Sequence, residues 1–163
     1  MFAIPCQIGS LRVKKAICDL GASINVMPMF VYCASNAGPL KETRVFIQLA
    51  DRSMVSPVGV LEDVLVVVDG LIFPADFYVL DMEEKLSSKF YEILLGRPFL
   101  SKSKTKIDVH KSILTMELDG DMIKFDVFSN IKSLNDVSSV CGIEAIDPLI
   151  PKKCAGLGKN MHE

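Results

Sequence analysis

One short segment of the sequence presents a carboxylate where it could act as an acid or a base. The apolar run Ala16-Ile17-Cys18 is followed by Asp19, and then by Leu20-Gly21-Ala22-Ser23. Glycine lets a chain turn back sharply, and small neighbours let main-chain groups approach a carboxylate. Taken alone the pattern is weak, because a strand followed by Asp and Gly is also an ordinary turn. Asp19 is therefore a candidate catalytic residue that needs support from elsewhere.

Two further segments give that support, and they follow in a fixed order. Ile93-Leu94-Leu95-Gly96 is an apolar strand that ends at glycine, and it continues as Arg97-Pro98-Phe99-Leu100. Between this segment and Asp19, Gln48-Leu49-Ala50-Asp51-Arg52-Ser53 has the polar tip that is typical of a β-hairpin. An acid on a turn, a polar-tipped hairpin and an apolar-apolar-Gly strand together are far more specific than any one of them.

The three motifs together resemble the protease region of plant Ty3/gypsy-type retrotransposon polyproteins, which is related to the retroviral proteases. The resemblance covers about residues 2 to 130. It implies an all-β, retropepsin-like closed β-barrel, the acid protease fold, with a flap hairpin and one or two short helices. It also implies a protease domain at residues 1–130 and a linker or flexible tail at residues 131–163, towards the reverse transcriptase region.

The resemblance also implies a role for each motif. Asp19 would be the catalytic aspartate, and the active-site loop would continue through Leu20, Gly21, Ala22 and Ser23. Residues 46–58 would form the flap, and its substrate-binding residues would be Leu49, Ala50, Asp51, Arg52 and Ser53. The supporting second motif, which packs behind the catalytic loop, would consist of Leu94, Leu95, Gly96 and a structural Arg97.

The chemistry of this family predicts a homodimer. One carboxylate must take a proton from the attacking water while another group supplies a proton to the carbonyl oxygen. Only one Asp-x-Gly-Ala element occurs in the chain, so the second aspartate must come from another copy. Asp108 has no glycine after it, and we interpret it as structural. The expected activity is an aspartic endopeptidase that processes its own Gag-Pol polyprotein, bound as an extended peptide, without a metal or a cofactor.

Two positions depart from the family pattern. Most active aspartic proteases have Ser or Thr after the catalytic Asp, with a hydroxyl that bonds across the dimer, whereas this chain has Leu20. Retroviral members tend to have an acid two positions after the Gly, paired with the Arg of the second motif, whereas Ser23 stands here opposite Arg97. The alternative function is therefore a catalytically weak or inactive retropepsin-fold module for dimerisation or peptide binding.

Composition excludes several other classes of function. A net charge of -2 offers no basic footprint for nucleic acid. No apolar run approaches the ~20 residues that span a bilayer, and no signal peptide is apparent, so we expect no membrane partner and a cytoplasmic location, with virus-like particles as one possibility. Five cysteines without a C-x-x-C pair indicate free thiols rather than a zinc site.

The elements that must position these motifs are mostly strands. We expect a first hairpin through Gly9-Ser10, and two more through Asp69-Gly70 and Asp119-Gly120, which are strong hairpin signals. Residues 45–49 and 58–68 predict strands on either side of the flap tip. Residues 27–32 predict a short helix or turn, with Pro28 at the first helical position. So many strands need a sandwich or a barrel to bury their apolar faces.

Overall fold

A computed structural model of the chain describes residues 2–81 and 92–126. The predicted tail at residues 131–163 lies outside these ranges, as do the last four residues of the predicted domain.

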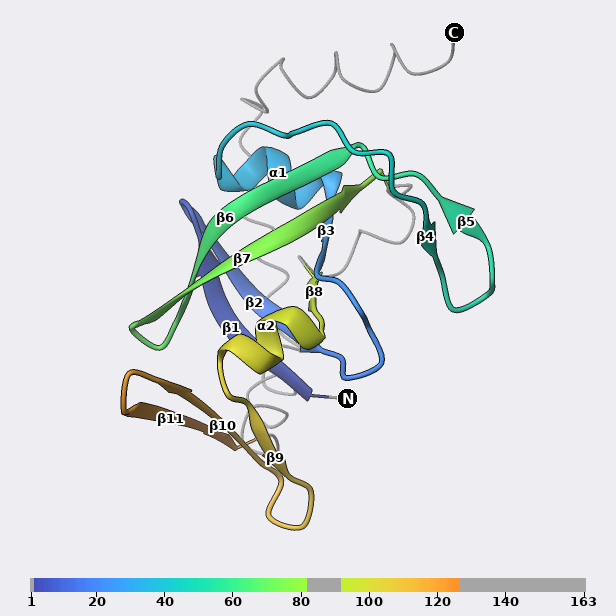
Figure 1. The fold of residues 1–163 in the computed structure, drawn as a ribbon. Helices are drawn as coiled ribbons and strands as arrows, with labels where there is room; N and C mark the ends of the chain where they lie inside the picture. The colour runs from blue at the N-terminus through green and yellow to red at the C-terminus, as the bar shows by residue number, and fades with distance from the viewer. Residues whose placement is uncertain (1, 82–91, 127–163) are drawn as a thin grey trace, which may run out of the picture.

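Six strands close into a barrel, which confirms the predicted all-β architecture (Figure 1). In hydrogen-bonded order the strands are β1 (Phe2–Ile8), β2 (Leu11–Cys18), β8 (Glu92–Leu95), β3 (Val26–Pro28), β7 (Leu71–Leu80) and β6 (Gly59–Val68), which pairs back with β1. Closure gives each of the six strands a hydrogen-bonded neighbour on both sides over part of its length, which limits the number of unpaired backbone groups.

The hairpins form where the turn residues predict them. Gly9 has φ of 56° between β1 and β2, and Asp69 and Gly70 have φ of 46° and 85° between β6 and β7. Two successive positive φ angles match the twist of the flanking strands, and Asp-Gly adopts them at little cost. The same geometry recurs at Asp119 and Gly120, between β10 (Ile113–Leu118) and β11 (Asp121–Asp126).

The pairings of β8 with β2 and with β3 set the position of the candidate site. β8 runs parallel to β2, with Cys18 opposite Leu95, and antiparallel to β3, with Val26 opposite Leu94. The chain that leaves β2 and returns as β3 must therefore cross the end of β8. That crossing segment carries Asp19 and the residues that follow it.

The core fills the barrel and extends under the second helix. Its largest fully buried side chains are Phe73, Phe77, Phe99, Ile4, Ile8, Met27, Leu61, Ile93, Leu95, Leu114, Met116 and Val13. Phe99 belongs to α2 (Arg97–Lys102), and its ring meets that of Phe73 edge-on, with centroids 5.5 Å apart. This aromatic contact fixes α2 against β7, directly after the second motif.

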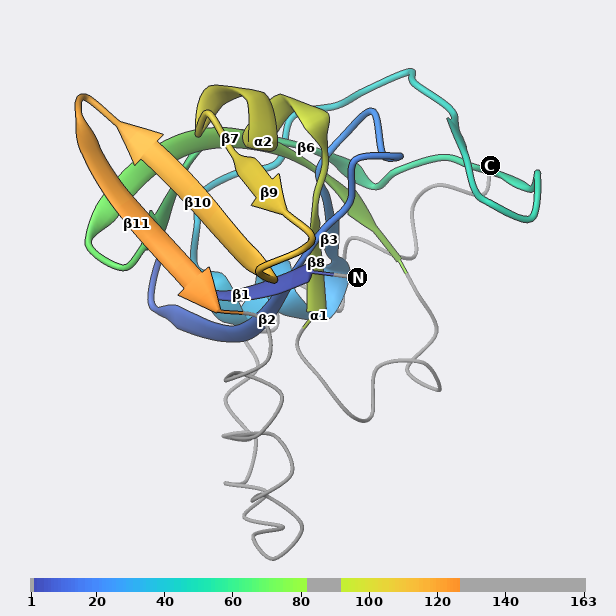
Figure 2. The same cartoon turned by 90° about the horizontal axis from the view of Figure 1, so that it is seen from below.

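Three smaller parts surround the barrel (Figures 1 and 2). Helix α1 (Met29–Ser35) packs beside β3, and the short strands β4 (Ile47–Gln48) and β5 (Met54–Val55) form a projecting hairpin. Strand β9 (Lys106–Asp108) joins β10 and β11 in a three-stranded sheet next to the barrel.

Two local predictions need correction. Residues 26–28 form a strand, and Pro28 is the extended residue that precedes α1 rather than its first helical residue. The predicted strand at 58–68 is confirmed as β6, but it pairs with β7 rather than across the flap tip. The predicted strand at 45–49 is reduced to β4, which closes the flap hairpin with β5.

No helix in the described ranges is both long and apolar enough to cross a membrane. Within the same residues, no three His, Cys, Asp or Glu side chains gather as they would around a metal ion.

Candidate active site

Asp19 stands at the end of β2, on a loop held by its own backbone and by β8. The Asp19 amide donates a hydrogen bond to the Leu95 carbonyl over 3.0 Å, which continues the parallel pairing of the two strands. The Gly21 amide donates to Asp19 Oδ1 over 2.8 Å, and the Ala22 amide to the Asp19 carbonyl over 3.3 Å. The half-buried carboxylate is thus oriented by a main-chain donor, as the Asp-x-Gly spacing predicts.

Gly96 lies directly behind this loop, and it has to be glycine. A Cβ atom there would lie 2.2 Å from the Ile24 carbonyl oxygen and 2.9 Å from that of Ala22. Both atoms belong to the backbone, so neither can move without moving the loop that carries Asp19. The Arg97 amide also donates to the Ala22 carbonyl over 2.9 Å. The structure therefore brings the loop that carries Asp19 and the supporting second motif into direct contact, as predicted.

Asn25 is a positioning residue that the sequence analysis missed. Its buried side chain accepts a hydrogen bond from the Gly96 amide over 2.8 Å and donates one to the Asp76 carbonyl over 2.9 Å. Its own carbonyl accepts from the Tyr78 amide over 3.0 Å. One side chain thus ties the loop after Asp19 to β7 and β8. The sequence contained one signal of this role, namely a side-chain amide between apolar Ile24 and Val26, where a strand begins.

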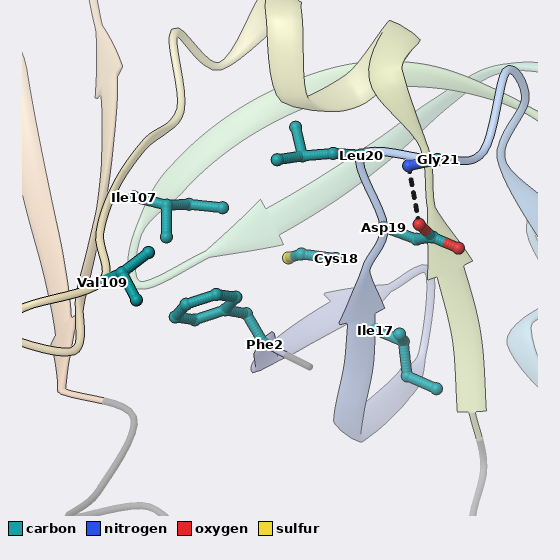
Figure 3. A pocket seen from close by; sticks show the side chains of 8 residues that line it. All are labelled: Phe2, Ile17, Cys18, Asp19, Leu20, Gly21, Ile107 and Val109. Atoms are coloured by element: carbon teal, nitrogen blue, oxygen red, sulfur yellow. Dashed lines mark hydrogen bonds between the residues drawn. The ribbon is translucent and has the colours of Figure 1, made fainter.

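Successive side chains from Cys18 to Leu20 point to opposite sides of the chain, as expected for extended backbone. Figure 3 shows Cys18 and Leu20 on one side, where they face Phe2, Ile107 and Val109, and the Asp19 carboxylate on the other. These residues, with Ile17 and Gly21, line an open depression of about 460 Å³. Asp19 is the one acidic residue among the eight that line it.

Two thiols lie under the site. Cys6 and Cys18 are free and buried, and burial raises the pKa of each to about 12, with the neighbouring Cys18 adding to the effect on Cys6. A thiol with so high a pKa is a weak nucleophile at neutral pH. The expectation of free thiols holds at Cys6 and Cys18 and fails at Cys33, which is disulfide-bonded.

The predicted flap residues form a compact turn. The Arg52 amide donates to the Leu49 carbonyl, and the Leu49 amide to the Ser53 carbonyl, each over 2.9 Å. Asp51 Oδ1 accepts from both the hydroxyl and the amide of Ser53, and these two bonds lower the pKa of the Asp51 carboxyl. No hydrogen bond between described residues joins residues 49–53 to the Asp19 loop, so the flap tip stands apart from the other two motifs.

The expected contact between Ser23 and Arg97 is absent from the described part of the chain. Both residues are exposed, and no side-chain hydrogen bond links them. Arg97 acts instead through its backbone amide at the start of α2. Its structural role is thus carried by the main chain.

Comparison with solved structures agrees with the closed barrel. One similar structure is the retroviral protease-like domain of Ddi1 from Leishmania major, with a TM-score of 0.54 at 21% sequence identity. The similarity covers 77% of this chain and 91% of that domain. The chain has a retropepsin-like fold.

No family model matches the sequence, and no curated protein matches it either.

Proposed function

We propose that the chain is an aspartic endopeptidase that is active as a homodimer and cleaves extended peptide segments of its own retrotransposon Gag-Pol polyprotein. The observation that carries the proposal is the Asp19 carboxylate, held at 2.8 Å by the Gly21 amide on a loop that Gly96 supports from behind. Peptide hydrolysis fits a loop of this kind at the edge of a retropepsin-like barrel.

The two Asp19 carboxylates of such a dimer would share one proton. Like charges ~3 Å apart disfavour double ionisation, so one carboxyl stays protonated over an intermediate pH range. The ionised Asp19 takes a proton from water, whose oxygen attacks the peptide carbonyl carbon. The protonated Asp19 of the other copy donates to the carbonyl oxygen. Return of a proton to the departing nitrogen then breaks the C–N bond.

The flap supplies a second supporting feature. Its hairpin carries exposed apolar side chains at Phe46, Leu49 and Met54, next to the polar turn at Asp51 and Ser53. An extended peptide bound as an added strand would meet backbone donors and acceptors, with alternate side chains entering apolar pockets. We therefore assign residues 49–53 to substrate contact.

A longer Gag-protease segment, expressed with Asp19 or with Asp19→Asn, tests the proposal. We expect self-cleavage with Asp19 and an intact, equally stable polyprotein with Asp19→Asn, because the amide cannot act as the base. We also expect inhibition by a pepstatin-like statine, whose hydroxyl mimics the hydrated carbonyl. Cleavage that persists in the Asp19→Asn chain, or that requires added zinc after chelation, would refute an aspartic mechanism.

The second candidate is a binding or dimerisation module of the same fold without activity. The observation that favours it is Leu20, which cannot make the hydrogen bonds that Ser or Thr would supply beside the acid. In that case an Asp19→Asn chain would bind the same extended peptides with the same affinity as the Asp19 chain, and neither would cleave them. Fold alone does not choose between these two functions.

A further inference from the structure

A second hollow lies on the outer face of the barrel, and the proposed mechanism does not use it. Its volume is about 530 Å³, which is within the range of sites that bind ligands in proteins. Outward-facing side chains of β6 and β7 form its floor, and α2 forms one of its walls. Six of its lining residues are Ile24, Glu42, Asp76, Tyr78, Pro98 and Lys102.

Two other walls of the hollow continue into the elements that would hold a substrate. Ile24 and Asn25 directly follow the active-site loop, which ends at Ser23. Glu42 and Thr43 come just before the flap. An extended peptide bound between the flap and the active-site loop would pass over the hollow as it leaves the site. The hollow is therefore placed to contact a residue of the same peptide outside the part that is cut.

Hydrogen bonds hold these walls in place, so the hollow is preformed. Lys41 and Val60 exchange two backbone hydrogen bonds of 2.9 Å, which fix the segment of Glu42 against β6 (Figure 1). The Asp63 amide donates to Asp76 Oδ1 over 2.8 Å, which orients that carboxylate. Preformed sites lose less conformational entropy on binding than mobile ones.

Two carboxylates of the hollow have no cationic partner. Within residues 2–81 and 92–126, Glu42 makes no hydrogen bond or ion pair, and Asp76 accepts only at Oδ1. The ammonium group of Lys102 is engaged elsewhere, because it donates to the Pro74 carbonyl over 2.9 Å. The third carboxylate of the lining, Glu62, is paired with a neighbouring lysine. The charge of the hollow therefore favours a cation.

Much of the remaining lining is apolar or aromatic. Ile24, Pro98 and the half-buried Tyr78 contribute to it. The methylene chain of a lysine or arginine packs on such a surface while its charged end reaches polar groups. The face of a tyrosine ring also attracts a cation. An acidic side chain would instead meet carboxylates of the same sign.

We propose that this hollow binds a lysine or arginine side chain of the substrate, at a position away from the residues that flank the cleaved bond. The inference rests on the proposed function, because it assumes a peptide held between the flap and the Asp19 loop. Glu42 and Asp76 are then specificity-determining residues. A homodimer has two copies of the hollow, so one basic residue can be bound on each side of the cleaved bond.

The test measures peptide binding by fluorescence anisotropy, on 163-residue chains that carry Asp19→Asn so that no peptide is cut. The probes are labelled peptides of about twelve uncharged residues, ~40 Å long when extended, in which one lysine replaces each position in turn. We expect lysine to lower the dissociation constant at least ~fivefold at one position on either side of the cleaved bond. The gain should shrink in high salt, because salt screens charges near the surface.

Glu42→Gln combined with Asp76→Asn should abolish the gain from lysine. Both side chains are exposed, both replacements keep the size, and an amide oxygen at position 76 can still accept from the Asp63 amide, so folding is retained. The matched control is Asp121→Asn, which removes an exposed carboxylate on β11 outside the hollow, and we expect it to keep the gain.

A gain from lysine that survives the double change would overturn the inference. An equal loss in Asp121→Asn, an equal gain from glutamate, or no peptide binding at all would also overturn it. The proposed function is judged separately, by cleavage in chains with Asp19. Cleavage without any preference for lysine would leave the function standing and remove the inference. Binding that depends on lysine and on the two carboxylates, without any cleavage, would support the hollow as a peptide site and contradict the endopeptidase.

Discussion

The backbone amide of Gly96 donates a 2.8 Å hydrogen bond to the side-chain oxygen of Asn25, which lies 71 residues earlier in the chain. The bond joins the two halves of the candidate site, because Asn25 follows the loop of Asp19 and Gly96 ends the strand behind it. The side-chain nitrogen of Asn25 donates a second hydrogen bond, to the Asp76 carbonyl in β7. One buried side chain therefore holds three segments that share no local sequence.

Replacing Asn25 with alanine should destabilise the fold. The change leaves the buried Gly96 amide and the Asp76 carbonyl without partners, at ~1 to 3 kcal/mol for each unpaired group. We expect the free energy of unfolding of Asn25→Ala to fall by about 2 to 5 kcal/mol in urea titrations. Gln48→Ala, an exposed amide on β4, is the control and should change it by less than about 0.5 kcal/mol. Equal effects of the two changes would show that the Asn25 bonds contribute nothing specific.

Replacing Gly96 with alanine should be more damaging, for reasons of space rather than backbone strain. The added methyl group would meet the Ile24 and Ala22 carbonyls at 2.2 and 2.9 Å, so the Asp19 loop would have to shift. We expect a loss of at least about 3 kcal/mol in stability, or failure to fold.

The control for Gly96→Ala is Gly70→Ala, because Gly70 has φ of 85° but nothing within 4 Å of the added atom. It should cost only the strain of a left-handed residue, about 1 to 2 kcal/mol. If both variants lose the same stability, the close approach behind Asp19 is not what requires glycine at position 96.

The sequence predicted those parts of the fold that depend on local signals. Asp69-Gly70 and Asp119-Gly120 marked their hairpins because paired positive φ angles select these residues. The contact between the Asp19 and Gly96 motifs was predictable through the family resemblance, which pairs them across more than seventy residues.

The parts that escaped prediction depend on contacts between distant residues. The roles of Asn25 rest on partners 51 and 71 residues away, and a single amide in an apolar stretch does not name its partners. The flap strands β4 and β5 are two residues each, too short to show alternation. The depression beside Leu20 was hidden because Ile107 and Val109, which also line it, come from the far end of the described chain.

The buried thiols make stability depend on alkaline pH. The pKa of Cys6 and of Cys18 is raised from 9.0 to about 12 in the fold, so the folded chain keeps protons that the unfolded chain releases. The contribution of the two protonated thiols to the free energy of unfolding is fully present below pH 9 and is lost as the pH rises towards 12. The expected slope is about 1.4 kcal/mol per pH unit for each thiol.

Urea titrations at several pH values between 8 and 10.5 measure that slope. Lysine and tyrosine side chains also titrate in this range, so the comparison is with Cys18→Ala. Its free energy of unfolding should fall less steeply with pH, by the slope that one thiol contributes. The same burial predicts that iodoacetamide leaves cleavage activity intact at neutral pH. An identical slope in Cys18→Ala, or rapid alkylation of Cys18 in the folded chain, would contradict the raised pKa.

The last prediction concerns Asp51 at the flap tip. Asp51 Oδ1 accepts two bonds from Ser53 and shapes the turn that the proposed function assigns to substrate contact. Asp51→Ala removes both hydrogen bonds, so the turn at the flap tip should be less populated. We therefore expect kcat/KM to fall about threefold to tenfold. Sedimentation should show an unchanged association state, because the hydrogen bonds that Asp51 makes lie within the tip itself.

Asp121→Ala is the control for Asp51→Ala, since it also removes one exposed carboxylate but lies on β11. Because the Ser53 bonds lower the pKa of Asp51, the tip should keep its arrangement in mildly acidic solution and lose it only as the pH falls through that lowered value. Ser53→Ala should therefore lower kcat/KM as Asp51→Ala does. The acidic pH at which kcat/KM falls should also be higher in Ser53→Ala than in the unaltered chain. If Asp121→Ala lowers kcat/KM as much as Asp51→Ala does, net charge rather than the geometry of the tip controls the rate.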